Sequence, residues 1–114
     1  MFIPKFETVL DPTALEFIGA KQQIFIDGEF VDAVGGEFFP TSDPASTRQI
    51  TEVPLSDTRD VDLAVAAANR ALEDPSWARM LPSDRQKLLL DLADLIEAHG
   101  ETIANLETLD QGQP

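Results

Sequence analysis

The sequence has no cysteine and no tyrosine, and it holds one histidine and one tryptophan among 114 residues. Without cysteine the chain cannot form a disulfide, a thiolate metal site or a thiol nucleophile. Basic residues are also scarce, because eight Lys and Arg stand against twenty-one Asp and Glu, which gives a net charge of −13. No cluster of basic residues exists to bind phosphate groups, so the composition argues against a nucleic-acid partner or an anionic membrane partner.

Long apolar segments are missing as well. No window of about 18 consecutive apolar residues occurs, and Met1–Leu10 has no basic stretch followed by an apolar run. We therefore expect neither membrane insertion nor export, and we expect a cytoplasmic location. With 43% hydrophobic residues, the chain can still bury a core of the size typical of one small domain.

The first twenty-two residues are predicted to form an N-terminal arm. Asp11 and Pro12 suit the N-cap and first position of a short helix, which Gly19 would end. From Gln23 the pattern changes to β-branched and aromatic residues. Ile24–Ile26 and Glu29–Val31 flank an Asp-Gly pair, which predicts a β-hairpin.

Two further strands are expected before residue 55. Gly35-Gly36 would break the second strand, and Glu37–Thr41 would form a third that Pro40 keeps at a sheet edge. Gln49–Val53 alternates polar and apolar residues, which predicts a fourth strand ending at Pro54. We expect these four short strands to follow one another as a meander.

The remainder of the chain has helical periodicity. Asp57 and Asp60 are spaced as a capping box, and Asp74-Pro75 would close the helix that follows. Pro82 would open a second helix and Gly100 would end or relax it, while a third helix would stop near Gly112. The apolar positions of the three helices are Val61, Ala64, Val65, Ala68 and Leu72; Leu88, Leu89, Leu92, Leu95 and Ile96; and Ile103, Ala104, Leu106 and Leu109.

This set of elements lacks a complete core. The apolar helix stripes need a broad apolar surface to cover, and four short strands supply only part of one. We predict an α/β fold class, of α+β type within these residues, in which a hairpin or meander precedes two to three amphipathic helices. Part of the packing surface is expected to lie outside this sequence.

Residues able to carry catalysis are few. The lone His99 is expected at a helix C-terminus, where it complements the helix dipole. Gly35-Gly36 is not followed by a phosphate-binding glycine motif, and no serine has a histidine placed to activate it. Trp77 suits a packing anchor better than a ligand-stacking residue. Asp110 is more informative, because an acid in the last turn of a helix opposes the helix dipole, so hydrogen bonding, a cation or solvation must compensate it.

Five segments, taken in order, resemble the N-terminal quarter of the aldehyde dehydrogenase superfamily. They are similar to its opening hairpin, the strand ending in an Asn-Pro or Asp-Pro turn, its first helix, the connection into its second helix, and its Leu-Asp-x-Gly-Lys-Pro signature. The matching segments are Ile24–Val31, Phe39–Ala45, Asp60–Ala68, Trp77–Arg85 and Leu106–Pro114. Gln113 stands where lysine is common, and Leu81 stands where a serine or threonine cap is common.

The resemblance implies that residues 23–114 are the incomplete N-terminal portion of an NAD(P)-binding domain. The parent enzyme would oxidise an aldehyde to a carboxylic acid with NAD or NADP, and would be a homo-oligomer. The family's cysteine nucleophile, glutamate base and oxyanion asparagine lie later in its chain than this sequence reaches. We therefore expect no catalytic or cofactor-binding residue here, and no cofactor bound to this chain alone.

The resemblance also implies one metal site. Several family members hold a monovalent cation, K⁺ or Na⁺, between backbone oxygens near the strand-to-turn segment and a carboxylate of the Leu-Asp-x-Gly helix end. The matching residues are Thr41, Ser42 and Asp110. A helix C-terminus and converging carbonyl groups favour a cation, although local hydrogen bonding would also explain Asp110.

Two interpretations of function follow. In the first, the chain is part of an aldehyde dehydrogenase, and its partner is the remainder of that chain. In the second, it is a stand-alone, non-catalytic interaction module that uses its apolar helix stripes to bind a partner or itself. A fragment should unfold with poor cooperativity or self-associate, whereas an evolved module should unfold as one cooperative unit.

Overall fold

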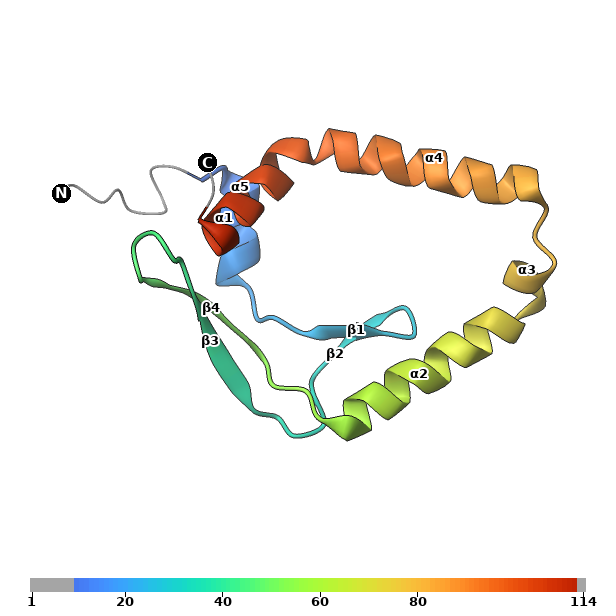
Figure 1. Cartoon of the computed structure of the whole chain (residues 1–114), viewed down its shortest axis with the longest axis horizontal. Helices are drawn as coiled ribbons and strands as arrows, with labels where there is room; N and C mark the ends of the chain where they lie inside the picture. Colours follow the sequence, from blue (N-terminus) through green and yellow to red (C-terminus); the bar gives the residue numbers. More distant parts are fainter. Residues whose placement is uncertain (1–9, 113–114) are drawn as a thin grey trace. The chain divides into compact units, whose positions relative to one another are not determined.

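A computed structural model describes residues 10–112 of the chain (Figure 1). These residues belong to two compact units. The first unit comprises the described parts of Met1–Gln22, Phe39–Val53 and Ile96–Pro114, and the second comprises Gln23–Phe38 and Pro54–Leu95. The predicted arm at 1–22 falls partly outside the described residues, as do the last two residues of the Leu-Asp-x-Gly signature.

The first unit is built on two helices that are distant in sequence. Helix α1 (Pro12–Gly19) begins as predicted, because the Asp11 side chain accepts hydrogen bonds from the backbone N–H groups of its first turn. Helix α5 (Gly100–Gln111) contacts α1. The packing leaves Ala14 of α1 fully buried and Leu109 of α5 only 7% exposed. The segment predicted as an arm therefore shares a small core with the C-terminal helix.

Strands β3 (Phe38–Ser42) and β4 (Gln49–Pro54) form a two-stranded sheet, most of which belongs to the first unit. The Asp43 N–H donates to the carbonyl of Arg48 at 2.9 Å, which closes the connection between them. In an antiparallel pair, hydrogen-bonding residues alternate along each strand. Asp43 bonds to Arg48, which directly precedes the partner strand, and Pro40 lies an odd number of positions before Asp43, so the nitrogen of Pro40 faces the outer edge of β3. The missing N–H of Pro40 therefore removes no hydrogen bond between the two strands.

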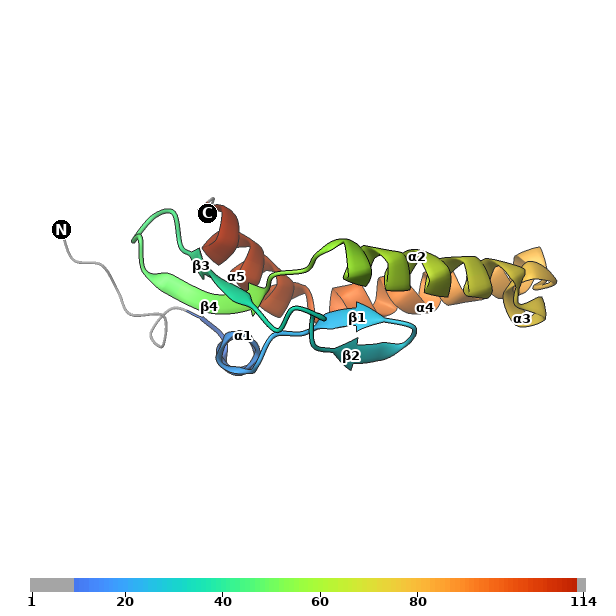
Figure 2. The same cartoon turned by 90° about the horizontal axis from the view of Figure 1, so that it is seen from below.

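The second unit opens with the predicted hairpin. Strands β1 (Ile24–Ile26) and β2 (Glu29–Val31) are antiparallel, and Ile26 pairs with Glu29 across the turn. Asp27 has φ 57° and Gly28 has φ 83°, and positive values at both positions are those of a type I′ turn. The hairpin lies alongside α2, which β1 contacts (Figure 2).

Three helices complete the second unit. Helix α2 (Thr58–Glu73) begins at a reciprocal capping box between Asp57 and Asp60. A four-residue helix, α3 (Pro75–Ala78), follows directly, with Asp74 as its N-cap. Helix α4 (Pro82–Ala98) opens at the predicted proline and is continued, after His99, by α5.

The architecture confirms the α+β class and corrects two details. The described strands form two separate two-stranded sheets, β1–β2 and β3–β4, in place of one four-stranded meander. The reason lies in the Ala33–Gly36 turn between β2 and β3, where the Gly36 N–H bonds to the Ala33 carbonyl and redirects the chain. Helix α3 was predicted as a plain connection, but the Asp74 cap and Pro75 favour one helical turn. The proposed domain boundary after residue 22 stays a prediction.

Candidate functional site

The turn between β3 and β4 is organised by one buried carboxylate. Asp43 is 7% exposed and accepts hydrogen bonds from the backbone N–H of Ala45 at 2.9 Å and of Ser46 at 3.1 Å. The hydroxyl of Ser46 donates to the same side chain. Thr47 completes the turn with φ 61°, a left-handed conformation that is uncommon for a β-branched residue. The Asp-Pro turn thus fixes the path of the chain just beyond Thr41 and Ser42.

These hydrogen bonds stabilise the charged form of Asp43. The Ser46 hydroxyl is the largest cause, and together with the backbone N–H groups it holds the pKa of Asp43 below its ordinary value, although burial opposes the shift. A carboxyl group with a depressed pKa in the folded state contributes stability above the unfolded pKa, which lies near about 3.9. That contribution is lost as the pH falls through the lower, folded pKa.

We expect Asp43→Asn to destabilise the β3–β4 turn at neutral pH and to have a smaller effect in acid. The asparagine side chain keeps one acceptor oxygen but lacks the negative charge that shortens and strengthens these hydrogen bonds. Urea unfolding of both proteins at pH 7 and below about pH 3 measures the difference. Ser46→Ala should produce part of the same pH dependence of stability. If the stability difference between wild type and Asp43→Asn does not change with pH, these hydrogen bonds do not stabilise the charged form of Asp43.

The C-terminus of α5 lies against this turn. Gly112 ends the helix in a left-handed conformation with φ 71°, and its N–H bonds to the Thr108 carbonyl at 2.8 Å. A Cβ atom placed on Gly112 would lie 2.7 Å from the Cγ of Pro44. The segment carrying Thr41 and Ser42 and the helix end carrying Asp110 are therefore neighbours.

The three predicted cation ligands differ in exposure. Asp110 is exposed on the last turn of α5, Ser42 is exposed at the end of β3, and Thr41 is half-buried. Within residues 10–112, the Asp110 carboxylate has no hydrogen-bond or ion-pair partner, and the last turn of α5 has no basic residue. Hydrogen bonding within residues 10–112 therefore does not explain Asp110, whereas solvation or a cation would. No cluster of three or more His, Asp or Glu side chains suited to a metal occurs in this part of the chain.

Asp11 links the two helices of the first unit. Its backbone N–H donates to Asn105 Oδ1 at 3.3 Å, and its Oδ1 accepts from the hydroxyl of Thr102 at 3.1 Å. The same Oδ1 caps α1, while Oδ2 is buried without a hydrogen-bond partner among the described residues. The sequence indicated the cap, but no local signal pointed to partners about ninety residues away.

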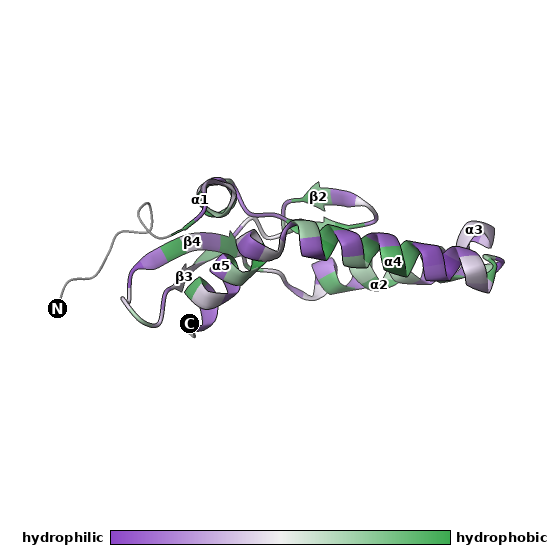
Figure 3. Ribbon diagram, turned by 90° about the horizontal axis from the view of Figure 1, so that it is seen from above, coloured by the Kyte–Doolittle hydropathy of each residue, from purple (hydrophilic) through white to green (hydrophobic). Residues whose placement is uncertain are grey.

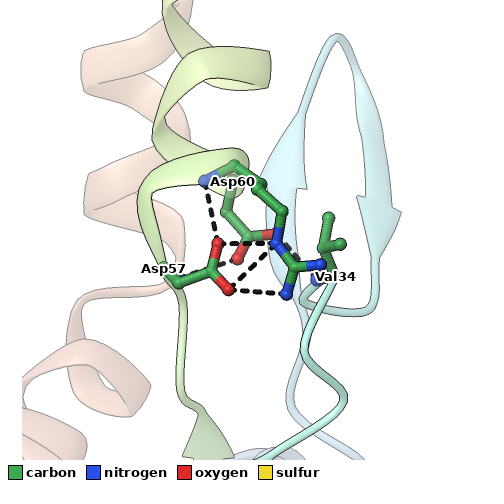
Figure 4. A network of polar contacts seen from close by, with 4 residues as sticks. Val34, Asp57 and Asp60 are labelled. Carbon is green, nitrogen blue, oxygen red and sulfur yellow. Dashed lines mark hydrogen bonds and ion pairs between the residues drawn. The ribbon is translucent and has the colours of Figure 1, made fainter.

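A second polar network anchors α2 (Figure 4). Asp60 is 3% exposed, and its two carboxylate oxygens accept from the backbone N–H of Val34 at 2.8 Å and of Asp57 at 2.9 Å. Arg59 pairs with Asp57 at 2.7 Å and, as the largest cause, holds the pKa of Asp57 below its usual range. The N-terminus of α2 is thereby attached to the segment after β2.

Trp77 and Arg85 form a pair that sequence reasoning did not identify. The Arg85 guanidinium lies 4.5 Å from the centre of the Trp77 ring, and its Nη2 donates to the Trp77 carbonyl at 2.8 Å. This cation–π contact joins Trp77 to α4, but Trp77 is 42% exposed, so its role as a packing anchor stays a prediction. His99 supplies no side-chain cap to α5.

Helices α2 and α4 carry many apolar residues (Figure 3), and these are exposed to a degree unusual for helix faces. Leu72 of α2 is 64% exposed and Leu89 of α4 is 68% exposed, and no residue of α4 is buried. The hydrophobic residues that are buried within residues 10–112 are only Ala14, Ala33, Ala67 and Leu109. Isolated exposed leucines need no explanation, but contiguous exposed stripes are typical of surfaces that another segment covers.

The described residues thus form ordered turns, helix caps and two polar networks. Over residues 30–114 the chain matches the model of the aldehyde dehydrogenase family. The chain belongs to that family. No helix within residues 10–112 is long and apolar enough to cross a membrane.

Relatives and solved structures support the assignment. The chain is 43% identical to an aldehyde dehydrogenase of Enchytraeus buchholzi over all of its length and 22% of that protein. It is 39% identical to a mitochondrial benzaldehyde dehydrogenase of Antirrhinum majus over 95% of this chain and 20% of that protein. The NAD⁺ complex of an aldehyde dehydrogenase from Bacillus cereus superposes with a TM-score of 0.85 at 42% identity, over 89% of this chain and 21% of that one. The chain spans about a fifth of the length of these relatives.

Proposed function

We propose that this chain is the N-terminal part of an NAD(P)-dependent aldehyde dehydrogenase. The family match over residues 30–114, together with a length about one fifth of the relatives', supports this proposal. Residues 23–114 would begin the NAD(P)-binding domain, and residues 1–22 would form an arm that precedes it. The parent enzyme would oxidise an aldehyde to a carboxylic acid, in the cytoplasm and as a homo-oligomer.

The residues of this chain would serve as scaffold in that enzyme. Family chemistry requires a cysteine thiolate, which attacks the aldehyde carbon, and the 114 residues contain no cysteine. NAD(P), when held by other parts of the enzyme, would supply the hydride acceptor for aldehyde oxidation. The residues present here do not fit a dinucleotide site, because the described sheets are antiparallel pairs and the sequence lacks a Gly-x-Gly-x-x-Gly motif. The chain alone is therefore proposed to be inactive.

The exposed apolar stripes of α2 and α4 support the same proposal. Leaving leucine side chains in water forgoes about 1.5 to 3 kcal/mol each relative to full burial. In the proposed parent, the remainder of the dehydrogenase chain covers these faces.

The intact mass of the polypeptide in its source cells tests the proposal. An antibody against residues 58–98 would capture every species that carries this segment, and mass spectrometry would measure each. We expect a species several times heavier than 12.5 kDa. A species of 12.5 kDa alone would contradict the proposal and favour the stand-alone interaction module.

We also propose that Thr41, Ser42 and Asp110 hold a monovalent cation. Three features support a weak site of this kind: the Asp110 carboxylate, which has no partner within residues 10–112, the carbonyl end of α5 and the adjacent β3–β4 turn. A single carboxylate with neutral oxygens suits K⁺ or Na⁺ better than a divalent ion, because divalent sites commonly use more charged ligands.

Asp110→Ala tests this site. The wild-type chain should unfold at a higher urea concentration in potassium or sodium chloride than in a bulky organic chloride at equal ionic strength, because the small cation binds only the folded state. Asp110→Ala should abolish that difference, whereas Glu107→Ala on the same helix should retain it. If the wild type unfolds at the same urea concentration in all three salts, the proposal that these residues hold a cation is wrong.

A further inference from the structure

The tip of the β1–β2 hairpin combines features that make a peptide bond chemically reactive. Asp27-Gly28 is the only Asp-Gly pair in the sequence. The side chain of Asp27 is 62% exposed, so water reaches its carboxyl group. In an Asp-Gly pair, the backbone nitrogen of the glycine can attack the Cγ carbon of the aspartate, because no side chain shields that nitrogen.

The structure leaves this nitrogen available. Ile26 and Glu29 pair across the turn, so Gly28 lies outside the strand ladder, and no described residue accepts a hydrogen bond from its N–H. Apart from Gly28 itself and its two chain neighbours, no heavy atom lies within 4 Å of the position that a Cβ on Gly28 would occupy. The nucleophile is therefore neither hydrogen-bonded nor crowded.

One contact opposes attack by the Gly28 nitrogen on the Cγ carbon of Asp27. The Arg70 guanidinium of α2 pairs with Asp27 Oδ2 at 2.8 Å. Ring closure removes one carboxyl oxygen as water and neutralises the group, so this ion pair must be lost before the ring forms. Both side chains are more than half exposed, and the pair is therefore sensitive to salt.

From this geometry we propose that Asp27 is a site of spontaneous isomerisation to isoaspartate, which Arg70 restrains. The Asp27 carboxylate first takes up a proton from solvent. The Gly28 nitrogen then bonds to Asp27 Cγ as one Cγ–O bond breaks, and the departing oxygen leaves as water with the proton of the Gly28 N–H, which gives a five-membered succinimide. Water then adds to either ring carbonyl and restores aspartate or forms isoaspartate, with no net change in mass. No oxidant, reductant or other reactant is needed.

Isomerisation would alter the attachment of the hairpin to α2. Isoaspartate adds one methylene group to the main chain inside a two-residue turn, whose type I′ geometry requires both residues at positive φ. It also moves the carboxylate to a new position on the backbone, away from its place opposite Arg70. The Asp27–Arg70 ion pair that joins the turn to α2 is consequently lost.

Ageing of the complete 114-residue chain at neutral pH and body temperature tests this proposal. Labelling by an isoaspartate methyltransferase, with peptide mapping, measures isoaspartate at each position over several weeks. We expect accumulation at Asp27 well above that at Asp62, which is followed by a leucine and lies in α2. Asp27→Glu should abolish the signal, because glutamate would need a six-membered ring. Equal accumulation at Asp27 and Asp62 would overturn the proposal.

The role of Arg70 has its own test. Arg70→Gln should raise the rate at Asp27 by about twofold to fivefold at low ionic strength, the factor that an exposed ion pair commonly contributes. High salt should raise the wild-type rate toward that of the variant. Arg59→Gln removes a comparable ion pair, with Asp57, and should leave the rate at Asp27 unchanged. Identical rates in wild type and Arg70→Gln at low salt would overturn the restraint by Arg70.

Discussion

Gly112→Ala should lower the free energy of unfolding of the first unit by about 2 to 5 kcal/mol. The left-handed backbone conformation accounts for roughly 1 to 2 kcal/mol of this loss. The remainder comes from the new Cβ, which would lie 2.7 Å from Cγ of Pro44, 3.5 Å from its Cβ and 3.8 Å from its Cδ. A proline ring cannot rotate away from the clash, so the end of α5 must move, at an overpacking cost of about 1 to 3 kcal/mol.

Substitutions at two other glycines separate the cost of the left-handed backbone from the cost of the clash with Pro44. Gly28→Ala has the same backbone problem at φ 83° but open space around its Cβ, so it should cost only the conformational part. Gly19→Ala has open space and no positive φ, and it should be neutral or stabilise α1 by up to about 1 kcal/mol. Urea unfolding and amide hydrogen exchange of α5 measure these effects.

A double substitution examines the clash directly. Pro44→Ala removes the ring, so Pro44→Ala/Gly112→Ala should recover the overpacking cost and leave the conformational cost. If Gly112→Ala costs no more than Gly28→Ala, the contact between α5 and the β3–β4 turn is not as close as described.

Asp60→Ala is expected to destabilise the second unit by about 2 to 3 kcal/mol. The substitution removes the acceptor for two backbone N–H groups, those of Val34 and Asp57. Loss of a helix cap commonly costs about 1 kcal/mol. Leaving a second, partly buried donor unpaired adds about 1 kcal/mol or more. The first turn of α2 and the segment after β2 should therefore both become less protected from hydrogen exchange.

Amide hydrogen exchange identifies that coupled change. The Val34 amide should exchange faster in Asp60→Ala together with the first turn of α2, although Val34 precedes the helix by more than twenty residues. Asp62→Ala, on the exposed surface of the same helix, should change stability by less than about 0.5 kcal/mol. Protection of Val34 that survives in Asp60→Ala would contradict the assigned bond.

Local elements were predicted well because their signals act over a few residues. Asp11 and Asp57 cap the helices that follow them, and Pro82 opens α4, because capping groups reach only the first turn of a helix. The Asp27-Gly28 turn was predicted for the same reason, since only residues that tolerate positive φ fit a type I′ turn. Helix α3 departs from the expectation, because Asp74-Pro75 both ends α2 and caps one further helical turn.

The candidate cation residues illustrate a limit of sequence reasoning. Thr41, Ser42 and Asp110 were selected through the family resemblance, since no periodicity links residues nearly seventy positions apart. The contact between Gly112 and Pro44 brings their segments together, and it depends on the packing of α5. Whether a cation binds there is decided by the salt experiment on Asp110→Ala.

The sequence by itself determined every described element except α3, the helix caps at Asp11 and Asp57, the Asp-Gly turn, the absence of thiol chemistry and the resemblance to aldehyde dehydrogenases. All of these depend on residue identity and on interactions between near neighbours. Only the tertiary structure decided that Asp11 joins α1 to α5, that Asp60 holds the segment after β2, and that the strands form two sheets. The Asp11 and Asp60 contacts join residues far apart in the chain, and their partners are selected by complementary shape and unpaired hydrogen-bonding groups, which no local pattern encodes.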